Sequence, residues 1–238
     1  MIPAAHTARD GLGVYLVTDT VLAGRHGRGV LGVVRAAVDA GVRTVQVRDK
    51  HASARELLGL AAAVADAVGD RATVVVDDRL DVVLAARHAG HRVAGVHLGQ
   101  SDVPVGVARA LLGPAAHVGL TANTPEHLAA VGALPAGTVD LLGVGVVHPT
   151  TTKTDHPAPL GVDGFGRIAA ATDLPCVAIG GVGLDDVPSL RAAGAAGVAV
   201  VSGICAAADP GAAAAAYVTA WRTAADQPAA PRLQGGVR

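Results

Sequence analysis

Short apolar runs recur along the chain and are separated by longer segments of mixed polarity. Eight of these runs contain four or five residues each: 14–18, 44–47, 73–76, 95–98, 117–120, 141–144, 176–179 and 198–201. Continuous apolar runs of this length are typical of strands that are buried on both faces of a parallel sheet. The pattern therefore predicts eight buried, parallel strands.

The segments between the runs carry signals for helix starts. Ser53 stands three residues before Glu56 and ahead of an apolar stretch, which is the pattern of a capping box. Thr124-Pro125 and Asp209-Pro210 place a capping side chain directly before proline at the first helical position. Strands and helices that alternate in eight units predict an α/β protein with a (β/α)8 TIM barrel. An open, doubly wound sheet is the alternative.

Composition indicates one soluble globular domain. Of the 238 residues, 51% are hydrophobic and 16% are charged, and no change in composition divides the chain. We therefore expect a single barrel domain over residues 1–225, followed by a disordered tail over residues 226–238. Cys176 and Cys205 lie in apolar runs without metal-ligand spacing, so we expect them to be buried thiols.

The charge balance narrows the class of partner. The formal net charge is −1, so we expect small-molecule substrates and neither a nucleic acid nor a membrane as partner. The first residues contain no apolar segment of a signal peptide, and a cytoplasmic location is expected. The Ala-rich outer helices leave some apolar surface, which is compatible with a homodimer.

Polar clusters follow the predicted strands directly. The carboxyl ends of barrel strands converge on one mouth, where active sites are built. After the second strand, Gln46, Arg48 and Lys50 alternate and so are expected to face the same space. A guanidinium fork beside a compact ammonium suits phosphate oxygens. For Arg48, a salt bridge to a neighbouring Asp is the alternative.

Carboxylates follow the next two strands. Asp77 and Asp78 come after the third strand and Asp102 comes after the fourth. Carboxylate oxygens on neighbouring strand ends suit Mg2+, which shares its ligands with substrate phosphates. A helix cap is the alternative for Asp102. For His97, within the fourth strand, a hydrogen-bonded core histidine is the expectation.

The last three strands lead into small and hydroxyl-bearing residues that could hold a phosphate. Thr150 and Thr152 precede Lys153 in the loop after the sixth strand. Gly180-Gly181 follows the seventh strand and Val201-Ser202 ends the eighth. Hydroxyls, backbone N–H groups and the start of a short helix form the recurrent phosphate site of such barrels. A plain polar turn is the alternative for the threonine loop.

These motifs occur in an order that resembles the thiamine-phosphate synthase family. They are YLVTD (15–19), VQVRDK (45–50), DDR (77–79), GVHLGQSD (95–102), GLTAN (119–123), GVGVVHPTTTK (143–153), AIGGV (178–182) and VAVVSGI (198–204). The resemblance implies a transferase that condenses hydroxymethylpyrimidine diphosphate with hydroxyethylthiazole phosphate, releases pyrophosphate and requires Mg2+.

The resemblance also implies a role for each matching residue. Lys153, which would reach the leaving pyrophosphate, and Thr121, which would stand near the pyrimidine, are the expected catalytic residues. The remaining assignments are Gln46, Arg48, Lys50 and Asp77 for the pyrimidine diphosphate, Thr150, Thr152, Gly180, Gly181, Val201 and Ser202 for the thiazole phosphate, and Asp78 and Asp102 for Mg2+. Thr121 and Lys153 count among the pyrimidine diphosphate residues as well.

Some positions depart from the family pattern, and two other functions stay open. Asp77 replaces an Asn, Asn123 replaces a His, and Val146 replaces a Pro. The alternatives are a thiazole tautomerase, which needs an acid or base near the ring, and a non-catalytic phosphate-binding barrel. Gln46, Arg48 and Lys50 favour the synthase because they provide for a second, diphosphate-bearing substrate.

Overall fold

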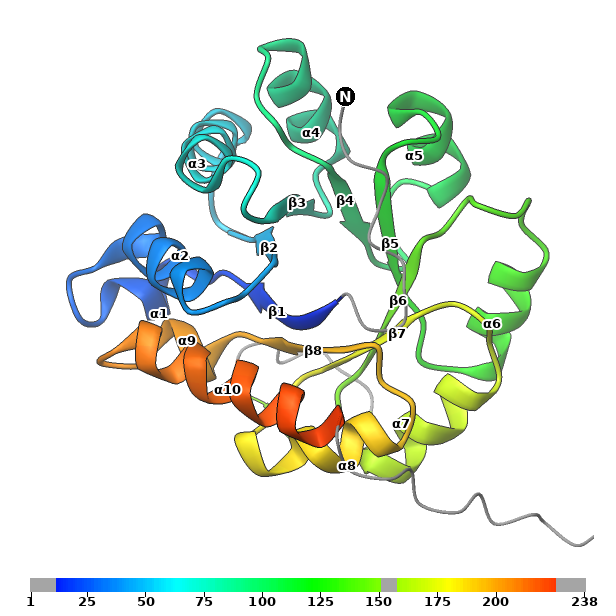
Figure 1. Ribbon diagram of the computed structural model, residues 1–238. Coiled ribbons are helices and arrows are strands. Elements are labelled where there is room, and N and C mark those ends of the chain that lie inside the picture. Colours follow the sequence, from blue (N-terminus) through cyan, green and yellow to red (C-terminus); the bar gives the residue numbers. More distant parts are fainter. Residues whose placement is uncertain (1–11, 151–157, 226–238) are drawn as a thin grey trace, which may run out of the picture.

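The computed structural model describes residues 12–150 and 158–225, which form a closed barrel of eight parallel strands (Figure 1). The strands are β1 (Gly13–Val17), β2 (Thr44–Val47), β3 (Thr73–Asp77), β4 (Gly95–Leu98), β5 (His117–Thr121), β6 (Leu141–Gly145), β7 (Cys176–Ile179) and β8 (Gly197–Val200). Each strand pairs with the next, and β1 pairs in parallel with β8. The predicted (β/α)8 barrel is confirmed, and the open sheet is excluded.

Helices surround the barrel and follow its strands. They are α1 (Thr20–Gly24), α2 (Gly29–Asp39), α3 (Ala54–Val68), α4 (Leu80–His88), α5 (Val105–Leu112), α6 (Pro125–Gly132), α7 (Gly161–Ala170), the 3-10 turn η1 (Leu184–Asp186), α8 (Val187–Ala192), α9 (Ser202–Cys205) and α10 (Pro210–Ala225). Among these described elements, no helix is long and apolar enough to cross a bilayer.

The predicted helix starts are confirmed. The backbone N–H of Glu56 donates to the Ser53 hydroxyl, and the Glu56 carboxylate accepts from the Ser53 N–H, which completes a capping box on α3. Thr124 accepts from the backbone of α6. Asp209 accepts from two N–H groups of α10, each at 3.0 Å. These local signals therefore place the helices between the strands as the sequence indicates.

Strand ends differ from the prediction by at most one residue, and three strands have the predicted bounds. The largest consequence is at Val201, which was expected to end the last strand. Its φ of −109° and ψ of −84° take it out of the strand, because it turns the chain into α9. The predicted tail at residues 226–238 lies outside the described residues, as do Thr152 and Lys153.

Two apolar clusters explain why most strand positions are apolar on both faces. One cluster lies inside the barrel and consists of Tyr15, Val17, Val75, Leu141, Val177 and Ala199. The other fills the layer between the strands and the helices. Successive strand residues point alternately into one cluster and the other, so neither face of a strand is left to water. Both cysteines are free and buried, as expected.

The C-terminal helix completes the outer ring. α10 packs against α2, α8 and β1 (Figure 1). The Trp221 ring lies beside Gly13 of β1, and the Arg191 guanidinium lies 4.6 Å from the centre of that ring. Arg191 also donates to the Trp221 carbonyl at 2.7 Å. The last helix is thereby attached both to the first strand and to α8.

A polar cluster joins β5 and β6 at their amino ends, opposite the mouth. Arg109 of α5 pairs with Asp140 at 2.7 Å, and Asp140 also accepts from the Val118 N–H at 2.7 Å. Arg109 donates in addition to the carbonyl groups of Ala116 and Thr138. At this end the Arg109 guanidinium thus satisfies backbone carbonyl groups, and the Asp140 carboxylate satisfies a backbone N–H.

Candidate active site

A cavity of about 420 Å3 opens at the carboxyl ends of the strands and reaches into the barrel. This volume suits small organic substrates. Every predicted site residue that the structure describes lines it: Gln46, Arg48, Lys50, Asp77, Asp78, Asp102, Thr121, Thr150, Gly180, Gly181, Val201 and Ser202. The residues that the sequence suggested from separate loops therefore belong to one site.

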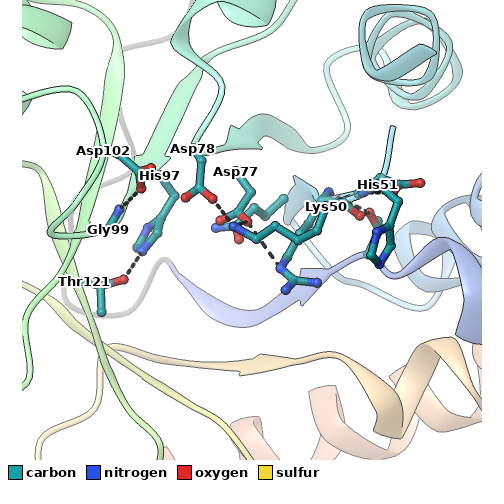
Figure 2. Close-up of polar contacts among 12 residues, drawn as sticks. Lys50, His51, Asp77, Asp78, His97, Gly99, Asp102 and Thr121 are labelled. Carbon is teal, nitrogen blue, oxygen red and sulfur yellow. Dashed lines mark hydrogen bonds and ion pairs between the residues drawn. The ribbon is translucent and has the colours of Figure 1, made fainter. Parts of the chain in front are cut away.

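Cations and carboxylates alternate along one wall of the cavity (Figure 2). The Lys50 ammonium contacts the Asp78 carboxylate and lies 3.4 Å from an Asp77 oxygen. The Arg48 Nε lies 3.3 Å from the same Asp77 oxygen. The salt bridge considered for Arg48 therefore exists, and the side chain nevertheless lines the cavity.

The close spacing of charges along this wall shifts the pKa values of Asp77 and Lys50. Burial, together with the negative charge of Asp78, raises the pKa of Asp77 to about 6, although Lys50 and Arg48 act in the opposite direction. Burial lowers the pKa of Lys50, but the hydrogen bond to Asp78 and the charge of Asp77 outweigh it, so that this pKa is raised. Lys50 therefore keeps its charge at neutral pH.

Asp78 and Asp102 adjoin one another at the mouth (Figure 2). Asp102 accepts from the Gly99 N–H at 2.7 Å rather than capping α5, whose N-cap is Pro104. Burial raises the pKa of Asp102, the Gly99 N–H opposes this, and the neighbouring Asp78 carboxyl raises it further. Two adjoining carboxylates are the donors that a hard cation prefers, so the residues present fit Mg2+.

Two carboxylates alone do not enclose a metal ion. Within residues 12–150 and 158–225, no group of three or more His, Cys, Asp or Glu residues is arranged to hold one. Mg2+ at this position would therefore complete its coordination with water and with substrate oxygens, as is usual for this ion.

A second polar pair forms deeper in the barrel. The Gln46 amide donates to the Tyr15 hydroxyl at 3.0 Å, and both side chains are buried. Burial raises the pKa of Tyr15, so this phenol stays neutral. Sequence reasoning did not select Tyr15, because a Tyr within an apolar strand is usually a core residue. Its signal is that it is one of only two Tyr in the chain.

A third polar pair links β4 to β5. The His97 Nε2 lies 3.1 Å from the Thr121 hydroxyl oxygen (Figure 2). His97 is hydrogen-bonded, as expected, but the expectation of a core position is wrong, because the ring lines the cavity. The Gln100 amide donates to the Thr121 carbonyl at 2.6 Å. Thr121 is thus held through its side chain and its backbone.

Asn123, which replaces the family's His, has a defined structural partner. Its side-chain oxygen accepts from the Gly145 N–H at 3.0 Å, and its own N–H donates to His127 Nδ1 at 3.2 Å. The amide thereby connects the end of β5 to the end of β6. An amide in this arrangement neither gives nor takes a proton in a reaction.

The Gly180-Gly181 turn packs tightly against the loop that follows β6. Both glycines have positive φ, +88° and +69°. A Cβ on Gly181 would lie 2.8 Å from the His148 carbonyl oxygen, and a Cβ on Gly180 would lie 2.4 Å from a Val146 methyl carbon. His148 Nε2 also lies 2.9 Å from Asp186 in η1. Glycine is therefore required here for conformation and for space.

Two polar residues, Asp19 and His91, lie outside the cavity. Asp19 accepts from the Leu22 N–H and caps α1, so it is a turn residue. His91 pairs with Asp66 at 3.0 Å on the outer surface. Neither residue is among those that line the cavity.

A family model described as "Thiamine monophosphate synthase" matches residues 14–204. A thiamine-phosphate synthase of Corynebacterium efficiens is 50% identical over 181 residues, which cover 76% of this chain and 83% of that protein. One of Albidiferax ferrireducens is 44% identical over 208 residues, which cover 87% of this chain and 90% of that protein.

A solved structure agrees with these sequence matches. A thiamine phosphate pyrophosphorylase from Pyrococcus furiosus superposes with a TM-score of 0.77 at 28% identity, and the match covers 91% of this chain and 98% of that one. The similarity therefore extends over nearly the whole barrel of both proteins.

Proposed function

The chain belongs to the thiamine monophosphate synthase family, and we propose on this basis that it joins hydroxymethylpyrimidine diphosphate to hydroxyethylthiazole phosphate. The products are thiamine phosphate and pyrophosphate, so the protein is a transferase. The observation that carries the proposal is the wall of Arg48, Lys50, Asp77 and Asp78, with Asp102 adjoining Asp78. A diphosphate with Mg2+ supplies the counter-charges for both kinds of side chain.

We assign the diphosphate to Arg48 and Lys50. Arg presents a planar fork and Lys a compact charge, and both suit phosphate oxygens. On binding, each cation would exchange a carboxylate partner for a phosphate oxygen, which leaves the Asp78 oxygens available for the metal. When bound between Asp78 and Asp102, Mg2+ supplies positive charge that offsets the charge of the diphosphate. We assign Lys153 to the leaving pyrophosphate.

The chemistry asks for charge stabilisation and alignment. The bond between the pyrimidine methylene carbon and the diphosphate oxygen breaks, and both electrons leave with the pyrophosphate. The electron-poor methylene then forms a bond to the thiazole nitrogen, whose lone pair supplies the electrons. A cavity that holds both partners in contact lowers the entropic part of the barrier, and fixed charges lower the electrostatic part. No strong base is needed.

We assign the thiazole phosphate to the loops after the last three strands. Thr150 and Ser202 provide hydroxyls, and the Gly180-Gly181 turn and Val201 provide backbone N–H groups at the mouth. Thr152 is assigned to the same phosphate. Gln46 and Thr121 lie deeper in the barrel and are assigned to the pyrimidine ring.

The position at which the family has a histidine carries an amide in this chain. Asn123 cannot act as an acid or base, and its oxygen is already bonded to Gly145. Tyr15 is buried and its pKa is raised. These observations favour the synthase over a thiazole tautomerase, while a cytoplasmic location and a homodimer stay predictions.

The test is turnover by the purified protein. With both substrates and Mg2+, we expect thiamine phosphate and pyrophosphate to form in equal amounts, and we expect a chelator to abolish the reaction reversibly. Asp102→Asn should raise the Mg2+ concentration needed for half-maximal rate about tenfold or more, because one of two carboxylate ligands is lost. Binding of the thiazole phosphate without any pyrophosphate release would contradict the synthase proposal.

A further inference from the structure

The His97 ring occupies a space that two glycines leave open. His97 is opposite Gly119 in the β4–β5 register, and Thr121 is opposite Gly143 in the β5–β6 register. A Cβ on Gly119 would lie 2.4 Å from His97 Nδ1, and a Cβ on Gly143 would lie 2.9 Å from its Cε1. The ring therefore lies where any larger residue at either position would displace it.

The space left by Gly119 and Gly143 directs the His97 ring toward the hydroxyl of Thr121. From β4 the His97 side chain passes over Gly119, and its Nε2 lies 3.1 Å from the Thr121 Oγ1 (Figure 2). Thr121 is β-branched, so its χ1 is stiff, and its backbone is held by Gln100. The main freedom left to the residue is the direction of the hydroxyl hydrogen, which a hydrogen bond from His97 can fix.

We propose that His97 is a positioning residue that sets the Thr121 hydroxyl as a donor to the pyrimidine ring. The proposal rests on the proposed function, because the nitrogens of a neutral pyrimidine ring accept hydrogen bonds and do not donate them. A hydroxyl can donate to such a nitrogen and at the same time accept from His97. His97 therefore donates from Nε2 to Oγ1, and the Thr121 hydrogen points into the cavity.

The arrangement separates recognition of the ring from recognition of the diphosphate. The diphosphate is assigned to Arg48 and Lys50, whereas His97 acts on the pyrimidine ring through Thr121. Loss of the His97 donor should therefore weaken binding of the ring and spare binding of free pyrophosphate. A general loss of folding would weaken both.

The first experiment compares His97→Leu with His97→Gln. Leu removes the donor, and the Gln amide restores an N–H near the position of Nε2. For His97→Leu we expect the KM for the pyrimidine diphosphate to rise about tenfold, which corresponds to one lost hydrogen bond. The KM for the thiazole phosphate and the inhibition constant of pyrophosphate should change less than twofold. His97→Gln should recover most of the loss.

The second experiment is a double-mutant cycle with Thr121→Val. Thr121→Val alone should raise the same KM about tenfold. Because His97 acts through the hydroxyl, His97→Leu should add less than twofold in the Thr121→Val background. Additive effects would overturn the proposal, as would a His97→Leu variant with unchanged KM or a His97→Gln variant as weak as His97→Leu.

Two further measurements keep the outcome clear. Calorimetric binding of the pyrimidine diphosphate without thiazole phosphate should show the same pattern, so the test does not depend on turnover. If wild-type protein binds the pyrimidine diphosphate in the predicted pattern but releases no pyrophosphate, only the proposed function fails. Gly119→Ala, which displaces the ring but keeps the imidazole, should reproduce His97→Leu, and an unchanged KM there would also overturn the proposal.

Discussion

Asp77 stands where the family has an Asn, and we expect this difference to weaken binding of the diphosphate. Its carboxylate forms ion pairs with Arg48 and Lys50, the two side chains assigned to the diphosphate. It also adds a second negative charge beside Asp78, which is one reason why the pKa of Asp77 is raised. A carboxylate at this position therefore competes with the substrate for both cations.

We expect Asp77→Asn to lower the KM for the pyrimidine diphosphate about tenfold. Removing one negative charge a few ångströms from a diphosphate is worth about 1–2 kcal/mol at the dielectric of a partly exposed site. Steady-state kinetics at fixed Mg2+ measures this, with Asp81→Asn on the outer surface as the matched control. A loss of activity would instead mean that the carboxylate contacts a positive or hydrogen-donating part of the substrate.

At the scale of elements, the turn after β7 and the loop after β6 act as one unit. Gly181 has φ +69°, and its Cα approaches the backbone of His148 so closely that no side chain fits between them. The turn and the loop both contribute to the thiazole phosphate site proposed above. A change in the turn should therefore act on one substrate only.

We expect Gly181→Ala to raise the KM for the thiazole phosphate more than about tenfold and to lower the free energy of unfolding by about 1–3 kcal/mol. Gly183→Ala is the matched control, because Gly183 has φ −92° and its added Cβ would make only an ordinary contact with Asp186. Kinetics and urea denaturation measure the two effects. Equal behaviour of the two variants would show that the turn tolerates a side chain.

The amino end of β5 should make stability depend on pH. Burial lowers the pKa of His117 from the ordinary histidine value of 6.5, Asp140 opposes this, and Arg109 adds to it. The His117 Nε2 has no hydrogen-bond partner among the described residues. Below pH 6.5 the unfolded chain binds a proton at His117 and the folded chain resists it. Above pH 6.5, His117 is neutral in both states and does not reduce the free energy of unfolding. As the pH falls below 6.5, the free energy of unfolding decreases, because the unfolded chain binds the proton more readily.

Urea denaturation between about pH 5 and pH 8 tests this expectation. His117→Leu should remove part of the decrease at low pH, and His88→Leu, at an exposed histidine of α4, is the matched surface control. The fluorescence of Trp221, the single Trp of the chain, follows the transition. Identical pH curves for wild type and His117→Leu would contradict the assignment.

For the whole molecule, the eight strands and most of the site could be predicted from sequence. The strands were visible because a barrel strand is buried on both faces, and so each one is a continuous apolar run. The polar residues at the carboxyl ends of the strands can be recognised in the sequence because they form clusters directly after the apolar runs. The eight runs predict a barrel but leave an open sheet as the alternative, because closure depends on the pairing of Gly13 with Gly197, which lie at opposite ends of the described chain.

The parts of the site that were missed depend on contacts across the barrel. Tyr15 is recognised as a site residue by its hydrogen bond to Gln46 on the next strand. His97 is recognised by the space that glycines on two other strands leave for its ring. Neither residue stands in a polar cluster of the sequence. Asp102 was placed correctly at the mouth, but only the structure shows that its carboxylate holds the Gly99 N–H instead of a helix.

The attachment of α10 should contribute to global stability but not to catalysis. Arg191 holds both the ring and the carbonyl of Trp221, and neither residue is among those that line the cavity. We expect Arg191→Ala to lower the free energy of unfolding by about 1–2 kcal/mol and to leave KM values unchanged. The free energy of unfolding of Arg191→Lys should lie between those of wild type and Arg191→Ala. A changed KM in either variant would show that the attachment of α10 also affects catalysis.

Because β1 pairs with β8 and α10 lies against β1, the first and last described elements are neighbours in space. The order of strands around the ring thus has no fixed starting point. A circularly permuted chain could join residue 225 to residue 12 through a linker and begin in the exposed turn at residues 135–137, which joins α6 to β6. Such a chain would keep every strand pairing and the entire mouth, so where synthesis begins would be independent of where the reaction takes place.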